Sequence, residues 1–81
     1  MVTLTRADIE RARPIVAEIA IRTPLIEVDG LGLKLENLQP IGSFKLRGAW
    51  NAIRRRNPKA VVTSSAGNMA QGVALAARRL G

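Results

Sequence analysis

Lys45 is the residue of this 81-residue sequence whose position best suits covalent chemistry. It follows Ser43 and Phe44 at a point where the sequence predicts the first turn of a helix, with Ser43 as its cap. Because the positive end of the helix dipole and the nearby Arg47 disfavour an ammonium group there, the neutral amine that condenses with a carbonyl becomes more accessible. A solvated surface lysine at the start of a helix is the alternative that this segment alone leaves open.

A second candidate site is the segment Ser64-Ser65-Ala66-Gly67-Asn68, which leads from an expected strand into an expected helix. Free backbone amides and the helix dipole would favour a carboxylate or a phosphate there, and Asn68 adds a side-chain donor and acceptor. The alternative is an ordinary turn capped by Asn68 or a serine. Because the segment lacks both Gly-x-Gly-x-x-Gly and Gly-Lys-Ser/Thr, it does not indicate a nucleotide site.

Two charged clusters have plainer interpretations. The run Arg54-Arg55-Arg56, with Lys59, could bind the phosphates of a nucleic acid. The whole chain has only one Phe and one Trp, however, so it offers few aromatic side chains on which bases could stack. We therefore favour a solvated helix C-terminus, where cations interact well with the dipole. The acids Glu27, Asp29 and Glu36 could be proposed as a site for a hard cation such as Ca²⁺ or Mg²⁺. Carboxylates that alternate along strands beside a turn are, however, typical of the solvent-exposed face of a hairpin.

Composition excludes several kinds of chemistry. The chain has no His and no Cys, so thiol nucleophiles, Ser-His triads and ordinary zinc sites are ruled out. Residues 41–81 hold eight bases and no acid, which points to nucleic acid, to an anionic ligand, or to compensating acids on a partner segment. No apolar run is long enough to span a bilayer and the start is unlike a signal peptide, so we expect a cytoplasmic protein without a membrane partner.

The elements that must position these residues are expected in the order helix, hairpin, helix, strand, helix. Their predicted ranges are helix 6–20, strands 25–28 and 33–36, helix 44–56, strand 60–63 and helix 69–80. Thr5 and Asp8 predict a capping box, Pro14 predicts a kink or early break in the first helix, and Gly81 suits a helix C-terminus. The predicted core consists of two apolar stripes, Leu46, Ala49, Trp50 and Ile53 on one helix and Met69, Val73, Ala76 and Leu80 on the other.

Taken together, three stretches resemble the threonine dehydratase and serine dehydratase family, pyridoxal-phosphate enzymes of the tryptophan synthase β-like fold, or fold type II. They are Thr23-Pro24-Leu25, residues 33–49 around Lys45, and residues 62–74 around Asn68. The resemblance implies an α/β fold of which this chain is the incomplete N-terminal part. Residues 1–58 would belong to the large cofactor domain and residues 59–81 would be the first strand-helix unit of the small substrate domain.

Carried over residue by residue, the resemblance makes Lys45 the lysine that holds pyridoxal 5′-phosphate as an imine and moves the α-proton of the substrate. Phe44 would lie against the cofactor ring, and Asn68 would hydrogen-bond its phenolic oxygen. The substrate α-carboxylate would lie in Ser65-Ala66-Gly67-Asn68, next to Met69, which stands where many relatives carry histidine. The family's glycine-rich phosphate loop and its partner for the pyridine nitrogen are expected beyond Gly81.

The reaction implied is β-elimination of water from L-threonine or L-serine, which gives a 2-oxo acid and ammonia. The full-length enzyme is expected to be a homo-oligomer that acts on a small amino acid without a nucleic-acid partner, and the 81-residue chain alone is expected to be inactive. Within the family the alternatives are serine racemase and other ammonia-lyases. From another class, the alternative is a small basic nucleic-acid-binding module that uses residues 41–81.

Overall fold

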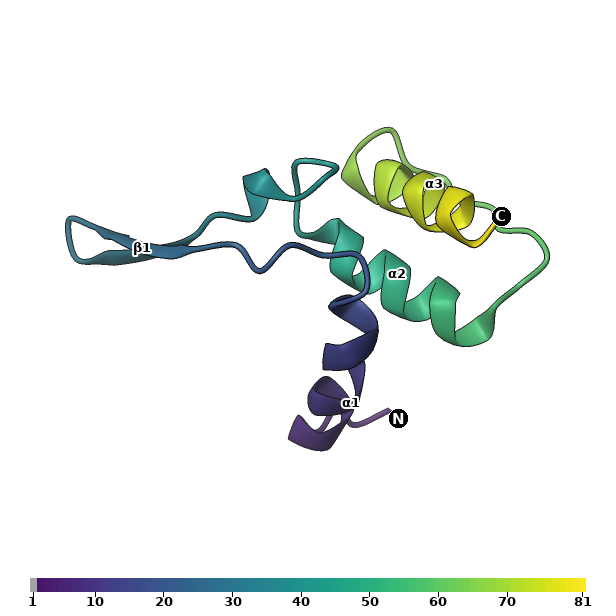
Figure 1. The fold of residues 1–81 in the computed structure, drawn as a ribbon, viewed down its shortest axis with the longest axis horizontal. Helices are drawn as coiled ribbons and strands as arrows, with labels where there is room; N and C mark the ends of the chain where they lie inside the picture. The colour runs from purple at the N-terminus through teal and green to yellow at the C-terminus, as the bar shows by residue number, and fades with distance from the viewer. Residues whose placement is uncertain (1) are drawn as a thin grey trace.

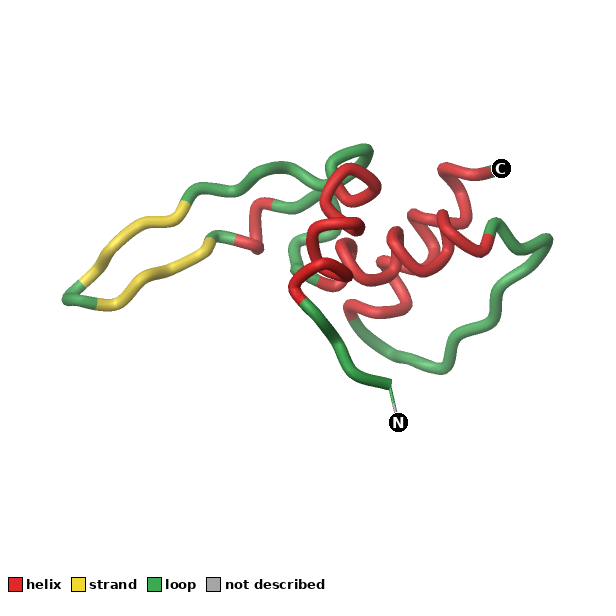
Figure 2. The backbone as a smooth tube through the Cα atoms, turned by 90° about the horizontal axis from the view of Figure 1, so that it is seen from below, coloured by secondary structure: helices red, strands yellow, loops and turns green. Residues whose placement is uncertain are grey.

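The computed structural model describes residues 2–81, which form three α-helices and one antiparallel hairpin (Figure 1). The elements in chain order are α1 (Arg6–Val16), β1 (Leu25–Val28), β2 (Leu31–Lys34), the 3-10 helix η1 (Glu36–Leu38), α2 (Lys45–Arg56) and α3 (Asn68–Leu80). Helices α2 and α3 lie side by side and α1 packs against α2, whereas the hairpin extends away from the helices (Figure 1, Figure 2). Within this described range no helix is long and apolar enough to cross a membrane.

Helix α1 begins with the expected capping box. The Asp8 amide donates to Thr5 Oγ1 at 3.2 Å, and the Thr5 amide donates to Asp8 Oδ2 at 2.9 Å. The helix ends at Val16, so the predicted end at residue 20 is wrong. After Pro14 the backbone changes to the three-residue hydrogen-bond spacing of a 3-10 turn, because the Glu18 amide donates to the Ile15 carbonyl at 3.1 Å. The Trp50 indole N–H donates to the same carbonyl at 2.9 Å.

The hairpin is present, but its second strand is Leu31–Lys34 rather than the predicted 33–36. Asp29 and Gly30 have φ angles of 50° and 77°, the two positive values that a two-residue loop of type I′ requires. Pairing therefore starts directly at Val28 opposite Leu31, two residues earlier than a four-residue turn would allow. Every residue of both strands is exposed.

The core lies between the helices. All four residues of the predicted α2 stripe, Leu46, Ala49, Trp50 and Ile53, are buried. On α3 the buried positions are Gly72 and Ala76, whereas Met69, Val73 and Leu80 are half-buried at the edge. Gly81 closes α3 with a φ of 96°, as its position predicts. The expected α/β class is confirmed in this arrangement of helices and a sheet.

The predicted strand over residues 60–63 is not formed. Residues 57–67 contain no helix or strand, and the Val62 side chain is 98% exposed. A β-branched run becomes a strand only where a neighbour pairs with its backbone, and among residues 2–81 the sheet consists of β1 and β2 alone. The proposed domain boundary between residues 58 and 59 stays a prediction.

Of the two glycines within the helices, Gly72 lies where α2 and α3 pack closely together. A Cβ atom built on Gly72 would lie 3.2 Å from Ala49 Cβ and 3.3 Å from the Lys45 carbonyl oxygen, whereas one built on Gly48 would meet nothing within 4 Å. We expect Gly72→Leu to lower the free energy of unfolding by about 2 kcal/mol through overpacking. Gly48→Ala should raise it by about 0.5–1 kcal/mol through helix propensity. Urea unfolding followed by Trp50 fluorescence measures both, and equal stability of the two variants would contradict the packing described.

Candidate functional site

Lys45 is the first residue of α2 and its side chain is half-buried. Its Nζ lies 5.4 Å from the centroid of the Phe44 ring, within the range of a cation–π contact. The structure places Phe44 rather than Ser43 at the N-cap, so the predicted cap is one residue out of place. The buried Ser43 hydroxyl instead accepts from the Lys45 amide at 3.2 Å, because the Phe44 backbone already has helical dihedral angles.

The segment 64–68 leads into α3, whose N-terminus is not capped by any side chain. Gly67 occupies the N-cap of α3 and no side chain caps the helix, so neither Asn68 nor a serine acts as the ordinary cap that the sequence left open. Ser65 Oγ accepts from the Gly67 amide at 3.2 Å and so holds the turn that precedes the helix. Residues Ser65 to Asn68 are exposed and Met69 is half-buried. The first amides of α3 are therefore available to a ligand.

Close packing brings the two candidate segments to one end of the molecule. Helices α2 and α3 run in the same direction, with both N-termini at the end where the hairpin leaves the helices (Figure 1). Gly72 of α3 packs against the Lys45 carbonyl, and Asn68 lies one turn earlier on the same face of α3. Lys45, Phe44 and the loop before α3 thus border the same region, although no hydrogen bond joins Lys45 Nζ to residues 65–69 within the described chain.

A polar network that the sequence did not reveal holds the start of α2. Glu36 Oε2 accepts from Thr23 Oγ1 at 2.5 Å, from Arg47 Nη2 at 3.0 Å and from Gln39 Nε2 at 3.2 Å. Gln39 in turn pairs with both backbone groups of Ile21, at 2.8 and 2.7 Å. The network joins three segments far apart in the sequence and fixes the helical turn that carries Lys45.

Glu36 therefore lies in this network and not on the solvent-exposed face of the hairpin, where the sequence placed it. Its side chain is 16% exposed, and no group of three acids that could hold a metal occurs among residues 2–81. The hydrogen bond from Arg47 lowers the pKa of Glu36 to about 2, and Glu36 raises the pKa of Arg47. The three-residue spacing of Glu36 and Gln39 is the feature of the sequence that could have revealed this network, because a 3-10 turn places side chains three residues apart on the same side.

The cationic run at the end of α2 takes its expected place. Arg54, Arg55 and Arg56 lie in the last turn of the helix, where cations favour the negative end of the dipole. Arg54 Nε also lies 3.3 Å from Glu18 Oε2, an exposed ion pair that links α2 to the segment after α1. The structure thus agrees with the interpretation of this run as a solvated helix end.

Comparison with known proteins shows the family to which the chain belongs. The chain belongs to the pyridoxal-phosphate dependent enzyme family, whose sequence profile matches residues 16–81. It is 44% identical over 90 aligned residues to the L-threonine ammonia-lyase of Thermotoga maritima, an alignment that covers 96% of this chain and 22% of that protein. It is 45% identical over 87 residues to the L-threonine dehydratase catabolic TdcB of Staphylococcus aureus, covering 91% of this chain and 25% of that protein.

These comparisons confirm the resemblance to threonine dehydratases. The chain spans about a quarter of the length of the curated relatives that it matches. No solved structure matches it significantly. The roles of Phe44, Lys45, Asn68 and the segment 65–69 stay predictions.

Proposed function

We propose that this chain carries the cofactor lysine and the substrate carboxylate loop of a pyridoxal-phosphate dependent enzyme that removes water and ammonia from L-threonine or L-serine. The observation that supports it most directly is the placement of Lys45 and the uncapped start of α3 at one end of a tightly packed helix pair. The substrate is a small amino acid, and the whole enzyme is proposed to be a homo-oligomer.

The residues present fit the cofactor. Lys45 Nζ lies 5.4 Å from the centroid of the Phe44 ring and makes no ion pair in the described part of the chain, so no carboxylate competes with an aldehyde for its amine. Phe44 is 59% exposed beside it, which leaves an aromatic face for a planar ring. Asn68 offers an amide that can donate to a phenolic oxygen.

The uncapped end of α3 suits the carboxylate of the substrate. Its first backbone amides lack partners within the helix, and the helix dipole adds a positive potential at the same place. Because Ser65 holds the preceding turn through the Gly67 amide, these groups keep a fixed orientation before a ligand arrives.

Transfer of the α-proton begins the reaction. When bound, pyridoxal phosphate supplies the electron sink that stabilises negative charge at the α-carbon. Lys45 takes the α-proton as a general base, and the loop before α3 holds the carboxylate so that this proton faces Nζ. The β-hydroxyl takes up a proton and leaves as water, which gives an enamine; a water molecule then hydrolyses the imine form of this product to the 2-oxo acid and ammonia.

A chimera tests this function directly. In it, residues 1–81 replace the aligned segment of the Thermotoga maritima L-threonine ammonia-lyase, and 2-oxobutanoate is measured after addition of L-threonine and pyridoxal phosphate. We expect sustained turnover in the chimera and none in the isolated 81-residue chain. A folded chimera that retains the cofactor without converting L-threonine or L-serine would contradict the proposed reaction.

Ala66 predicts the outcome of the reaction within the family. It stands where racemases that resemble this chain carry a serine, and without a hydroxyl there no side chain at that position can protonate the opposite face of the α-carbon. With L-serine, the chimera should form pyruvate in large excess over D-serine, and Ala66→Ser should increase the share of D-serine. A product mixture that is mainly D-serine in the unsubstituted chimera would favour the racemase alternative.

A further inference from the structure

The loop of residues 39–43 joins η1 to α2 and leads directly into Phe44 and Lys45. Neither of these two side chains is held by a hydrogen bond of its own among residues 2–81. Lys45 Nζ lies 5.4 Å from the centroid of the Phe44 ring, and that ring is largely exposed. The direction in which both side chains leave the helix is therefore set by the backbone that precedes α2.

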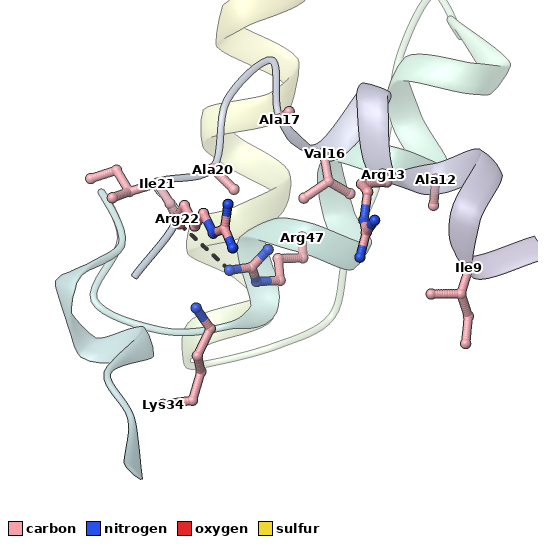
Figure 3. Close-up of a pocket in the computed structure, with 10 residues that line it drawn as sticks. All are labelled: Ile9, Ala12, Arg13, Val16, Ala17, Ala20, Ile21, Arg22, Lys34 and Arg47. Atoms are coloured by element: carbon pink, nitrogen blue, oxygen red, sulfur yellow. Dashed lines mark hydrogen bonds between the residues drawn. The ribbon is translucent and has the colours of Figure 1, made fainter. Parts of the chain in front are cut away.

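Gln39 holds the first end of this loop. Its side chain is 4% exposed, and both the oxygen and the nitrogen of its amide have partners. Oε1 accepts from the Ile21 amide at 2.8 Å, and Nε2 donates to the Ile21 carbonyl at 2.7 Å and to Glu36 Oε2 at 3.2 Å. The same Ile21 carbonyl lies 3.5 Å from Arg47 Nη2 of α2, the contact drawn as a dashed line in Figure 3. Gln39 thus ties the loop to a segment that also contacts α2.

Ser43 holds the other end of the loop. Its side chain is buried, and Oγ accepts from the Lys45 amide at 3.2 Å. Between the two ends the chain turns at Gly42, which has a φ of 74° and whose amide donates to the Gln39 carbonyl at 2.7 Å. The loop is therefore hydrogen-bonded at both ends and within its turn, so it presents the start of α2 in one orientation.

We propose that Gln39 and Ser43 are positioning residues for Lys45 and Phe44, an inference that rests on the proposed function. They hold the loop so that Lys45 Nζ faces the α-carbon of the substrate and the Phe44 ring keeps one orientation. Catalysis is sensitive to such placement, since a shift of about 1 Å can lower a rate about 100-fold. The substrate carboxylate lies at the start of α3, with which neither residue forms a hydrogen bond within residues 2–81. A looser loop should therefore slow proton transfer without weakening substrate binding.

Gln39→Met and Ser43→Ala in the chimera test this role. Gln39→Met keeps the length of the side chain but removes its three hydrogen bonds, and Ser43→Ala removes the acceptor of the Lys45 amide. We expect each variant to lower kcat for L-threonine by about tenfold and to change KM by less than about twofold. If Gln39→Met does not fold, Ser43→Ala decides the question, because it is the smaller change.

Two measurements that do not depend on turnover accompany the rates. The visible circular dichroism of bound pyridoxal phosphate should weaken in both variants, because the ring beside Phe44 is held less firmly. Hydrogen exchange of the backbone amides around Lys45 should become about tenfold faster, with or without the cofactor. Ile53→Val is the matched control, since it loosens the core about two turns further along α2 and should leave kcat and both of these readings unchanged.

The positioning role and the proposed function fail in different ways. A folded parent chimera without turnover contradicts the proposed function. Exchange around Lys45 that is as slow in Gln39→Met and Ser43→Ala as in the parent overturns the positioning role, whether or not the parent is active. An unchanged kcat in both variants of an active chimera also overturns it, as does an equal fall of kcat in Ile53→Val, which would show a general effect of lower stability.

Discussion

Replacement of Lys45 by alanine in the chimera is expected to abolish the visible absorbance of the bound cofactor and to lower the rate of 2-oxobutanoate formation by at least about 10³-fold. The chain has two other lysines, and neither can take its place. Lys34 donates to the Thr23 carbonyl, and Lys59 lies in the exposed segment after α2. Arg47 is close to Lys45 in the sequence, but its guanidinium stays protonated and cannot condense with an aldehyde.

Lys59→Ala is the matched control for this prediction. It removes an exposed lysine away from the start of α2 and should leave both the absorbance and the rate close to those of the parent chimera. Loss of activity in Lys59→Ala with retention in Lys45→Ala would contradict the assignment. A loss in both variants with retained absorbance would show that the lysine that binds the cofactor lies outside these 81 residues.

Replacement of Glu36 by glutamine is expected to lower the free energy of unfolding by about 2 kcal/mol at pH 7, because it breaks a charged hydrogen-bond network at a largely buried position. In the native chain the pKa of Glu36 is about 2, below its usual value of 4.5. A lowered pKa means that the carboxylate stabilises the fold above pH 4.5 and that this contribution is lost as the pH falls from 4.5 to 2. The variant should therefore lose much of its pH dependence in that range.

Urea unfolding followed by Trp50 fluorescence between pH 2 and pH 7 measures both effects. Glu10→Gln is the control, since Glu10 pairs with Arg6 on the surface with side chains 56% and 90% exposed. Such exposed pairs contribute about 0.5 kcal/mol or less, so Glu10→Gln should change little. If Glu36→Gln and Glu10→Gln were equally stable, the network would not hold the start of α2.

Local patterns predicted the presence of the three helices and the buried face of α2, but not the end of α1 or the full burial of the α3 stripe. The spacing of Leu46, Ala49, Trp50 and Ile53 required one buried stripe, and Thr5 with Asp8 required a capping box; both are present. Periodicity and capping depend on neighbours three or four residues away, so the sequence contains the whole signal.

Features that depend on distant segments could not be read in this way. The run 60–63 has the composition of a strand, but pairing needs a neighbour that composition does not supply. Glu36 joins Thr23 and Arg47 across 13 and 11 residues, so its role emerged only with the tertiary structure. The hairpin register was missed because Asp29 as well as Gly30 adopts a positive φ, which shortened the loop to two residues.

Borohydride reduction of the chimera loaded with pyridoxal phosphate, followed by proteolysis and peptide mapping, tests the central claim most directly. Reduction fixes the cofactor to the amine with which it has condensed, so the labelled peptide identifies the residue without any measurement of activity. We expect the label on the peptide that contains Lys45, and its disappearance in Lys45→Ala. A label on Lys34 or Lys59 in the unsubstituted chimera, with none on Lys45, would contradict the account.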